Sequence, residues 1–473
     1  MKKLLCMVLA ILVFASSIVP AAWAGEVDIL VRKLVEKGIL DESEGKVMLE
    51  EIRFESAKKD AVKKQEIVEE AQEDIAELTR KEIESILVKQ NIAKPKKDSF
   101  QVYWKDGLRF DTADKNFKLK VGGRIMAHTA WQKQETKLKD TVGKASGSAE
   151  FRRARLYMSG DIYKDFFFKA QYDFAGGDAD FKDVYLGMKN IPYLGAFKIG
   201  HFKEPFSLEE LTSSKYITFM ERGLPNVFAP SRNWGAEFSN TLFNKRATWA
   251  AGIFRPSDGY GNYSGSGWNF TGRLTALPWY EDKGEKLLHI GTAWTVHDPR
   301  GTVRYRQRPE DHLSPRYVDT GTFQIDYASL FNVELALVYG PFSLQSEFIQ
   351  GWVDQSHNNS SHTCFPSFYA YASYFLTGEH RKYKTSKGCF SRVKPKKNFS
   401  IKDKTWGAWE LGVRYSYLDL EDKNIEGGIM QDITAGVNWH WNPNMRVMGN
   451  YVHSNRNRVG GADILEARFQ VDF

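Results

Sequence analysis

The chain has 473 residues, of which 42% are hydrophobic, 14% aromatic and 26% charged, and its formal net charge is +7. A mean hydropathy of −0.46, with a single long apolar run at the N-terminus, excludes a protein that crosses a membrane with several helices. Three cysteines are too few for a disulfide scaffold, and 65 aromatic residues (13 Trp, 21 Tyr and 31 Phe) exclude collagen-like and disordered chains. A polar chain this rich in aromatic residues is typical of a transmembrane β-barrel.

The first residues have the pattern of a secretory signal peptide. Lys2 and Lys3 give a positive start, residues 4–19 an apolar run, and Ala22–Ala24 a small-residue cleavage site. The alternative, a transmembrane anchor, would need a longer run. We therefore expect a signal peptide over residues 1–24 and export of the chain.

Residues 25–98 predict a helical, coiled-coil-like stem. Between Phe54 and Leu78 the apolar residues recur at three- and four-residue spacing among Glu and Lys, which is typical of an amphipathic helix. A separate small helix begins near Ile29 and ends at Gly38. An oligomeric coiled coil and a solvated single helix both fit this pattern. The stem is acidic, so the positive charge belongs to the rest of the chain.

From about residue 115 apolar and polar residues alternate, which predicts strands with one lipid face and one wet face. The last segment is clearest, since one face holds Leu465, Ala467, Phe469, Val471 and Phe473 and the other Glu466, Arg468, Gln470 and Asp472. A soluble β-sandwich also alternates, but it needs neither aromatic-ended strands nor a signal peptide. The length of residues 99–473 predicts an all-β transmembrane barrel of about 16 antiparallel strands (roughly 14 or 18 also fit) around an aqueous channel.

Two arginine clusters carry candidate chemistry, because guanidinium groups bind phosphate and carboxylate oxygens in pairs. Arg153 and Arg155 share one face of a predicted strand whose other face is apolar. They are expected in the lumen, since arginine facing lipid in mid-membrane costs about 2–4 kcal/mol. Arg304, Arg306 and Arg308 would form a ladder if their segment is a strand. For both clusters the alternatives are lumen ion pairs and contacts with lipopolysaccharide at the outer rim.

Residues 204–233 do not alternate and contain three prolines, which predicts a folded loop. Loops this long inside compact architectures are usually functional. Folded into a barrel, this loop would narrow the lumen, and its Ser, Lys and Arg side chains would offer donors to a partly dehydrated oxyanion. The alternative is an extracellular surface loop.

The remaining signals are few. Cys364 and Cys389 would meet an oxidising compartment after export, so a disulfide is a candidate and two free thiols are the alternative. No pair of Cys or His has metal-ligand spacing, so neither a metal site nor a cofactor is predicted. No motif supports an enzyme. The basic residues lie on alternating strands whose other face is expected to contact lipid, and this argues against nucleic-acid binding.

Several linked motifs resemble the phosphate-selective porin O/P family, namely Glu150–Leu156, Asp183–Gly187, Gly200–Phe206, Leu211–Arg222 and Ala372–Arg381. The resemblance extends from about residue 115 to Phe473. It implies a trimeric, 16-stranded barrel in the outer membrane of a Gram-negative bacterium, surrounded by lipid and lipopolysaccharide. It further implies a passive channel for phosphate or other small anions, with the third loop folded inward and an arginine ladder.

The same resemblance implies roles for single residues. Ser213, Ser214 and Lys215 match loop positions that bind phosphate, and Arg222 lies in the same motif. At the constriction, the matching residues are Arg152, Arg153 and Asp183, of which Asp183 would accept a proton-bearing phosphate oxygen. Arg304, Arg306 and Arg308 resemble the ladder.

The stem departs from the family pattern, and three other functions stay open. One is a general diffusion porin of the same fold. Another is a sugar-specific porin, which would need an aromatic slide with carboxylates, so the excess of lysine and arginine argues against it. The third is an envelope tether whose periplasmic stem binds the cell wall.

Overall fold

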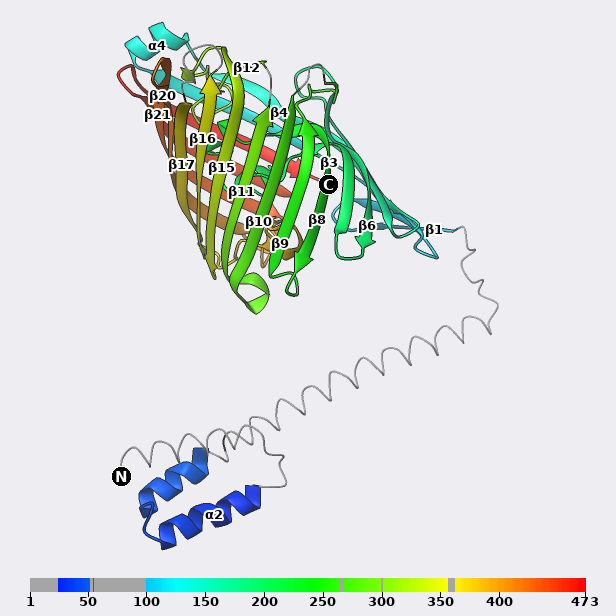
Figure 1. Ribbon diagram of the computed structural model, residues 1–473, viewed down its shortest axis with the longest axis vertical. Coiled ribbons are helices and arrows are strands. Elements are labelled where there is room, and N and C mark those ends of the chain that lie inside the picture. The colour runs from blue at the N-terminus through cyan, green and yellow to red at the C-terminus, as the bar shows by residue number, and fades with distance from the viewer. Residues whose placement is uncertain (1–23, 52–53, 55–98, 264–266, 299–300, 356–361) are drawn as a thin grey trace. The chain divides into compact units, whose positions relative to one another are not determined.

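The computed structural model describes residues 24–51, 54, 99–263, 267–298, 301–355 and 362–473 (Figure 1). The expected signal peptide and the expected amphipathic helix from Phe54 to Leu78 lie almost wholly outside the described residues. The chain divides into two compact units, Met1–Lys96 and Lys97–Phe473. None of the helices in the described part combines the length and the apolar character that a membrane crossing requires.

The described residues of the first unit include α2 (Ala24–Glu36) and helical residues 42–51. After α2, Gly38 adopts a left-handed φ of 68°, and its N–H donates to the Val35 carbonyl at 2.9 Å. This is a glycine cap at the position where the sequence predicts the helix end. The Asp41 carboxylate then accepts from the N–H groups of Ser43 and Glu44, which caps the second helix.

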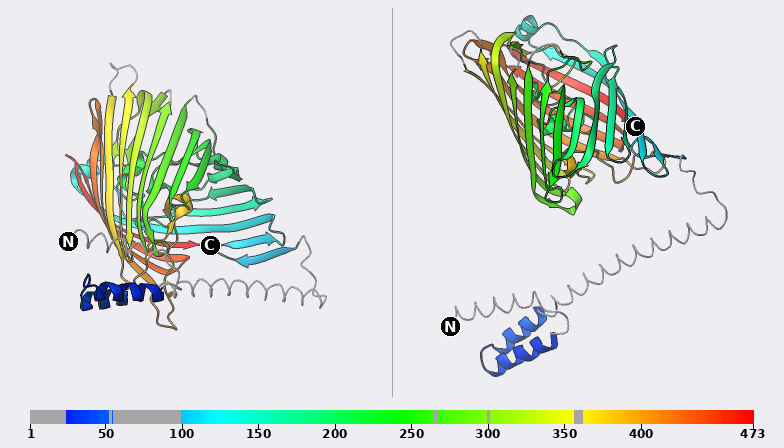
Figure 2. Two further views of the ribbon diagram at one scale, coloured as in Figure 1. Left: turned by 60° about the horizontal axis from the view of Figure 1, so that its bottom comes forward. Right: turned by 45° about the vertical axis from the view of Figure 1, so that its right-hand side comes forward.

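The second unit is a closed barrel of sixteen antiparallel strands, as predicted (Figures 1 and 2). Closure pairs the last strand with the first, from Ala462 opposite Gln134 to Asp472 opposite Arg124. The barrel strands are β3 (Phe117–Gln134), β4 (Ser148–Ile162), β5 (Phe166–Asp173), β6 (Asp180–Ile191), β7 (Gly195–Lys203), β8 (Arg232–Leu242), β9 (Ala247–Arg255), β10 (Trp268–Glu281), β11 (Lys286–Asp298), β15 (Phe323–Tyr339), β16 (Phe342–Gln355), β17 (His362–Phe375), β20 (Ala408–Asp422), β21 (Ile425–Asn442), β22 (Met445–Arg456) and β23 (Gly460–Asp472).

Short elements join or extend these strands. A hairpin of two of them, β1 and β2, continues the sheet, because β2 pairs with β3 from Leu108 opposite Val121 to Asp111 opposite Lys118, where β23 has ended. The short elements are β1 (Phe100–Trp104), β2 (Leu108–Thr112), α4 (Thr136–Val142), α5 (Leu208–Leu211), η2 (Leu224–Val227), η3 (Asp282–Gly284), β12 (Gly301–Val303), β13 (Arg306–Gln307), β14 (Val318–Asp319), β18 (Tyr383–Lys384), η4 (Thr385–Lys387) and β19 (Cys389–Phe390).

The two faces of the barrel wall follow the alternation in the sequence. On β23, Glu466 and Arg468 are buried in the lumen, whereas Leu465 and Phe469 are exposed on the outer face. The other strands repeat this arrangement, with apolar residues outward and polar residues inward. A wall of this kind presents an apolar surface to lipid on one side and a polar surface to water on the other.

The two ends of the barrel differ. At the end where β23 finishes, most connections are short turns, such as residues 163–165 and 443–444. The opposite end carries longer loops, among them residues 135–147 and 204–231. We call these the turn end and the loop end. In outer-membrane barrels the short turns face the periplasm.

Within the described part of the barrel, three connecting segments fold into the lumen: 204–231 and 304–322 from the loop end, and 376–407 from the turn end. Each bonds to a strand of the wall that it does not itself connect. Arg446 of β22 donates to the Ile217 carbonyl at 2.9 Å, the Glu310 N–H donates to Asp432 of β21 at 2.9 Å, and Arg381 donates to Gln345 of β16 at 3.0 Å. Segment 204–231 therefore crosses the lumen from the β7–β8 side to the opposite wall.

Candidate functional site

The middle of segment 204–231 lies against the inner face of four neighbouring strands, β22, β23, β3 and β4. Arg124 of β3 donates to Ser214 Oγ at 2.6 Å, and Lys215 Nζ lies 2.9 Å from an Asp472 carboxylate oxygen of β23. We call the charged groups at this contact the loop–wall cluster. Its cations are Arg124, Arg152, Arg153, Lys215, Arg392, Arg446 and Arg468, and its carboxylates are Glu221 and Asp472.

Strand register brings the arginines of β3 and β4 together. Arg124 is directly opposite Arg155, and Met126 is opposite Arg153. The register then shifts, because Ala127 pairs with Phe151 and leaves Arg152 as an extra residue. This bulge turns two consecutive side chains, Arg152 and Arg153, toward the lumen, which a regular strand would place on opposite faces.

The Glu221 carboxylate lies within 4.0 Å of three of these arginines. It accepts from Arg152 at 2.9 Å and 3.0 Å and from Arg468 at 2.7 Å, while Arg153 stays at 4.0 Å. Arg153 is buried, and among the described residues its Nε has no hydrogen-bond partner. A buried donor of this kind calls for an acceptor.

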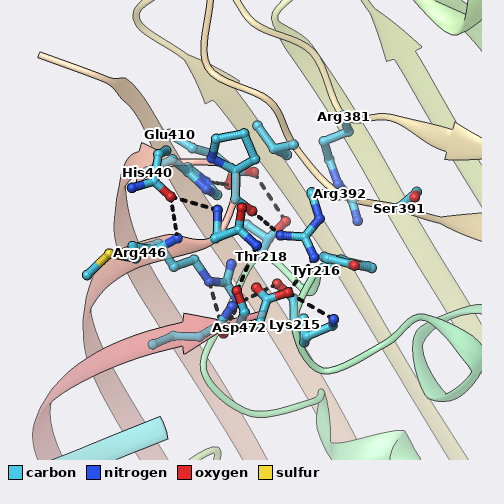
Figure 3. A pocket seen from close by; sticks show the side chains of 16 residues that line it. Lys215, Tyr216, Thr218, Arg381, Ser391, Arg392, Glu410, His440, Arg446 and Asp472 are labelled. Carbon is cyan, nitrogen blue, oxygen red and sulfur yellow. Dashed lines mark hydrogen bonds and ion pairs between the residues drawn. The ribbon is translucent and has the colours of Figure 1, made fainter. Parts of the chain in front are cut away.

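Asp472 pairs with two further cations beside a small cavity (Figure 3). It accepts from Lys215 and from Arg392, which comes from segment 376–407. The cavity has a volume of about 20 Å³ and is lined by Lys215, Tyr216, Arg392 and Arg446 among others, so it holds about one water. Burial lowers the pKa of Lys215 to about 8, against the opposing attraction of Asp472.

Cations outnumber carboxylates at this site. Arg124 bonds to Ser213 and Ser214, Arg446 to Gln470 and the Ile217 carbonyl, so both reach neutral acceptors only. Neither forms an ion pair with any carboxylate in the described part of the chain. The excess charge faces a lumen with low-dielectric walls, which raises the local concentration of anions.

A wider cavity of about 760 Å³ lies beside segment 204–231 toward the turn end. Its lysines include Lys169, Lys189, Lys198, Lys203 and Lys387. Asp183 is at its edge, where it accepts from Lys169 and, at 2.7 Å, from Arg232. The structure thus places Asp183 between two cations beside the cavity and not in the loop–wall cluster.

Arg222 does not reach the cluster. Its guanidinium donates to the backbone carbonyls of Glu209 at 2.9 Å and of Glu210 and Thr212 at 3.1 Å, and it pairs with the Glu210 carboxylate. These bonds occupy its donors within segment 204–231. In this structure the side chain holds the loop in shape, and the anion contact expected at Arg222 stays a prediction.

Arg304, Arg306 and Arg308 do not form the expected ladder on one strand face. The strand β12 ends at Val303, and β13 has only two residues, so no long strand carries the three side chains. Arg304 is exposed and paired with Asp319 at 2.5 Å, and Arg308 donates to the Ser314 carbonyl. In the described structure, arginines that do line the lumen come from β3, β4, β8, β10, β20, β22 and β23.

The disulfide candidate is not formed, because Cys364 and Cys389 are both free. Cys364 is exposed on the outer face of β17, near the loop end. Cys389 is buried inside the barrel, where it packs against Leu208 and Phe390. The barrel wall separates the two thiols.

Sequence reasoning missed Arg124, Arg446 and Arg468 as site residues. All three are on the polar face of an alternating strand, which is the signal that could have found them. Alternation alone does not single them out, since every strand has polar inward residues. Their selection depends on which strands meet segment 204–231.

A family model described as phosphate-selective porin O and P matches residues 119–473. Porin O of Pseudomonas aeruginosa is 28% identical over 397 residues, which cover 75% of this chain and 87% of that protein. An uncharacterized protein of Caulobacter vibrioides is 28% identical over 376 residues, covering 76% of this chain and 72% of that protein. Among solved structures, a loop L8 deletion mutant of the outer-membrane protein OmpT of Vibrio cholerae aligns with a TM-score of 0.49 and 10% identity, covering 76% of this chain and 100% of that chain. Because the family model spans most of the sequence, the chain belongs to the family of phosphate-selective porins O and P.

Proposed function

We propose that the barrel is a passive channel for small anions, and that inorganic phosphate or a similar oxyanion binds at the loop–wall cluster. The observation that carries the proposal is the excess of buried cations there, with Arg124 and Arg446 bonded to neutral groups only. An anion is the natural counter-charge for such groups.

Several donors would replace water around the anion. Ser213 and Ser214 offer hydroxyls, Lys215 an ammonium group, and Arg153 an Nε–H with no partner among the described residues. Donors spread over several side chains attract an ion but let it move on, which conduction requires. The residues bind and release the anion and form no covalent bond, so the protein acts as a channel and not as an enzyme.

The barrel belongs in the outer membrane of a Gram-negative bacterium, with its apolar outer face against lipid. We further propose that it works as a homotrimer and that the stem extends into the periplasm. The position of β1 beside the last strand's end, at the turn end, supports a periplasmic stem. We also propose that the stem contacts the cell wall.

Conductance of the purified protein in a planar bilayer under a KCl gradient tests the function. We expect a zero-current potential that reports anion selectivity, and a chloride current that phosphate blocks. Lys215→Gln and Arg124→Gln should each raise the phosphate concentration for half block by about tenfold, which corresponds to about 1.4 kcal/mol.

Arg304→Gln is the matched control, because it removes an exposed arginine already paired with Asp319. It should leave block and selectivity unchanged. Weak selectivity and no block in the wild type would overturn the anion site and make the protein a general diffusion porin.

A further inference from the structure

Three buried side chains meet in the lumen on the loop-end side of the loop–wall cluster. They are His128 of β3, Glu466 of β23 and Asp311 of the inward segment 304–322. His128 Nε2 is 3.2 Å from an Asp311 oxygen and 3.6 Å from Glu466 Oε1. One imidazole and two carboxylates thus converge from three separate parts of the chain.

Glu466 lacks the partners that a buried carboxylate requires. Glu466 is 1% exposed, and neither of its carboxylate oxygens has a hydrogen-bond partner among the described residues. Leaving such a group unpaired is costly, so a buried carboxylate points to a positive charge that completes it. Asp311 adds a second carboxylate beside it, held by Gln132 at 2.8 Å and Ser314 at 2.7 Å.

The nearest arginine does not supply that charge. Arg468 approaches His128 Nδ1 at 3.5 Å, but its guanidinium already bonds to the Glu221 carboxylate at 2.7 Å and to the Met220 carbonyl. Among the described residues it forms an ion pair with neither Glu466 nor Asp311. The two carboxylates therefore share only the imidazole of His128.

We infer that His128, Asp311 and Glu466 form a binding site for a divalent transition-metal ion, with Zn²⁺ as the best match. In a tetrahedral zinc site with bonds of about 2.0–2.1 Å, neighbouring ligand atoms are roughly 3.4 Å apart. The two distances from His128 Nε2 lie on either side of that value, and one ligand atom from each of the three residues lies within 4.8 Å of the other two. An imidazole ligand favours zinc over calcium and magnesium, which prefer oxygen ligands only.

The ion would join segment 304–322 to β3 and β23. Glu466 and Arg468 are on the same face of β23, two residues apart, so the bound metal would lie next to the loop–wall cluster on the path from the loop end. It would stabilise the position of the segment and add positive charge to the lumen. The spacing of 183 residues between His128 and Asp311 explains why no local motif reveals the site.

Metal binding is measured on the purified full chain in detergent after treatment with EDTA. We expect one Zn²⁺ per chain by calorimetric titration, and an intense visible absorption with Co²⁺ of the kind that tetrahedral sites give. Glu466→Gln and, independently, Asp311→Asn should weaken the affinity at least tenfold. Heat-resistant migration of each variant in gel electrophoresis checks that the barrel has folded.

His453→Asn is the matched control. His453 Nδ1 lies 2.8 Å from an Asp463 carboxylate oxygen on the exposed outer face, so it is the same kind of pair without a third ligand. This variant should bind Zn²⁺ like the wild type. Equal uptake by the wild type, Glu466→Gln and Asp311→Asn, or no uptake by any of them, would overturn the site and leave a histidine that shares a proton with two carboxylates.

Discussion

Lys215 makes the charge of the loop–wall cluster sensitive to pH. Burial lowers its pKa to about 8, so the side chain is charged at pH 7 and loses its proton as the pH rises through that value. We therefore expect anion selectivity for chloride to fall between about pH 7 and pH 9. Chloride does not titrate in this range, so the zero-current potential in a KCl gradient reports the protein alone.

Lys215→Arg separates this effect from other titrating groups. A guanidinium stays protonated across the range, so the variant should keep its selectivity at pH 9. A wild type and a Lys215→Arg variant that lose selectivity together would show that another group is responsible.

At the level of single residues, the local sequence predicts which chemical groups a segment offers better than it predicts where those groups lie in the fold. Ser213, Ser214 and Lys215 could be grouped from the sequence because consecutive loop residues stay together wherever the loop goes, and their contact with an anion stays a prediction. The orientation of Arg222 could not be predicted, because its donors turn back to carbonyls of Glu209 and Thr212 in a fold that the sequence does not reveal. Arg152 needed the bulge in β4, which has no residue signature of its own.

One carboxylate anchors the start of segment 204–231 to the lumen wall. Glu347 of β16 accepts from the N–H groups of Leu208 at 3.0 Å and Glu209 at 2.7 Å, and from the Tyr369 hydroxyl at 2.6 Å. Glu347→Ala leaves these buried donors unpaired, at about 1–3 kcal/mol each. We expect a higher single-channel conductance with rapid flicker and weaker phosphate block, because the loop is no longer fixed.

Glu281→Ala provides the comparison. This carboxylate is exposed and lies 3.8 Å from Lys286, so its loss should change neither conductance nor block. Unchanged conductance in Glu347→Ala, with the barrel folded, would mean that the other bonds to the wall suffice to hold the loop.

At the level of elements, strands were predictable and the direction of the connections was not. The alternation that predicts a strand over residues 324–339 matches β15, because each residue contacts either lipid or the lumen. Segments 304–322 and 376–407 carry no period that distinguishes an inward from an outward path. Their paths depend on bonds to distant strands, such as the one from Glu310 to Asp432.

For the whole molecule, length and alternation predicted the barrel and its strand number. Neither could show which inward residues become neighbours, since that depends on closure. Arg124 and Asp472 are at the two ends of the barrel sequence, yet closure places them directly opposite each other. The loop–wall cluster and the proposed metal site both lie across this β23–β3 seam.

The seam itself depends on a close approach at Gly122. A Cβ at this position would lie 2.4 Å from the Phe473 backbone carbonyl oxygen and 2.6 Å from the Tyr157 hydroxyl, so the strand end would have to move. Phe473 also exchanges two backbone hydrogen bonds with Gly123, at 2.8 Å and 3.1 Å. Gly122→Ala should therefore destabilise the folded barrel by about 1–3 kcal/mol and lower the temperature at which it loses its heat-resistant form in gel electrophoresis.

Gly272→Ala tests whether closure or glycine loss in general is responsible. Gly272 lies within β10, away from the seam, and the nearest atom to its Cβ position is the Ala250 carbonyl oxygen at 3.9 Å. Its replacement meets no clash and should leave the transition temperature unchanged or slightly higher, because alanine has fewer unfolded conformations than glycine. If both variants lose heat resistance at the wild-type temperature, the contacts of the last residues do not limit the stability of the barrel. A lower transition temperature in Gly122→Ala alone would show that the β23–β3 seam limits it.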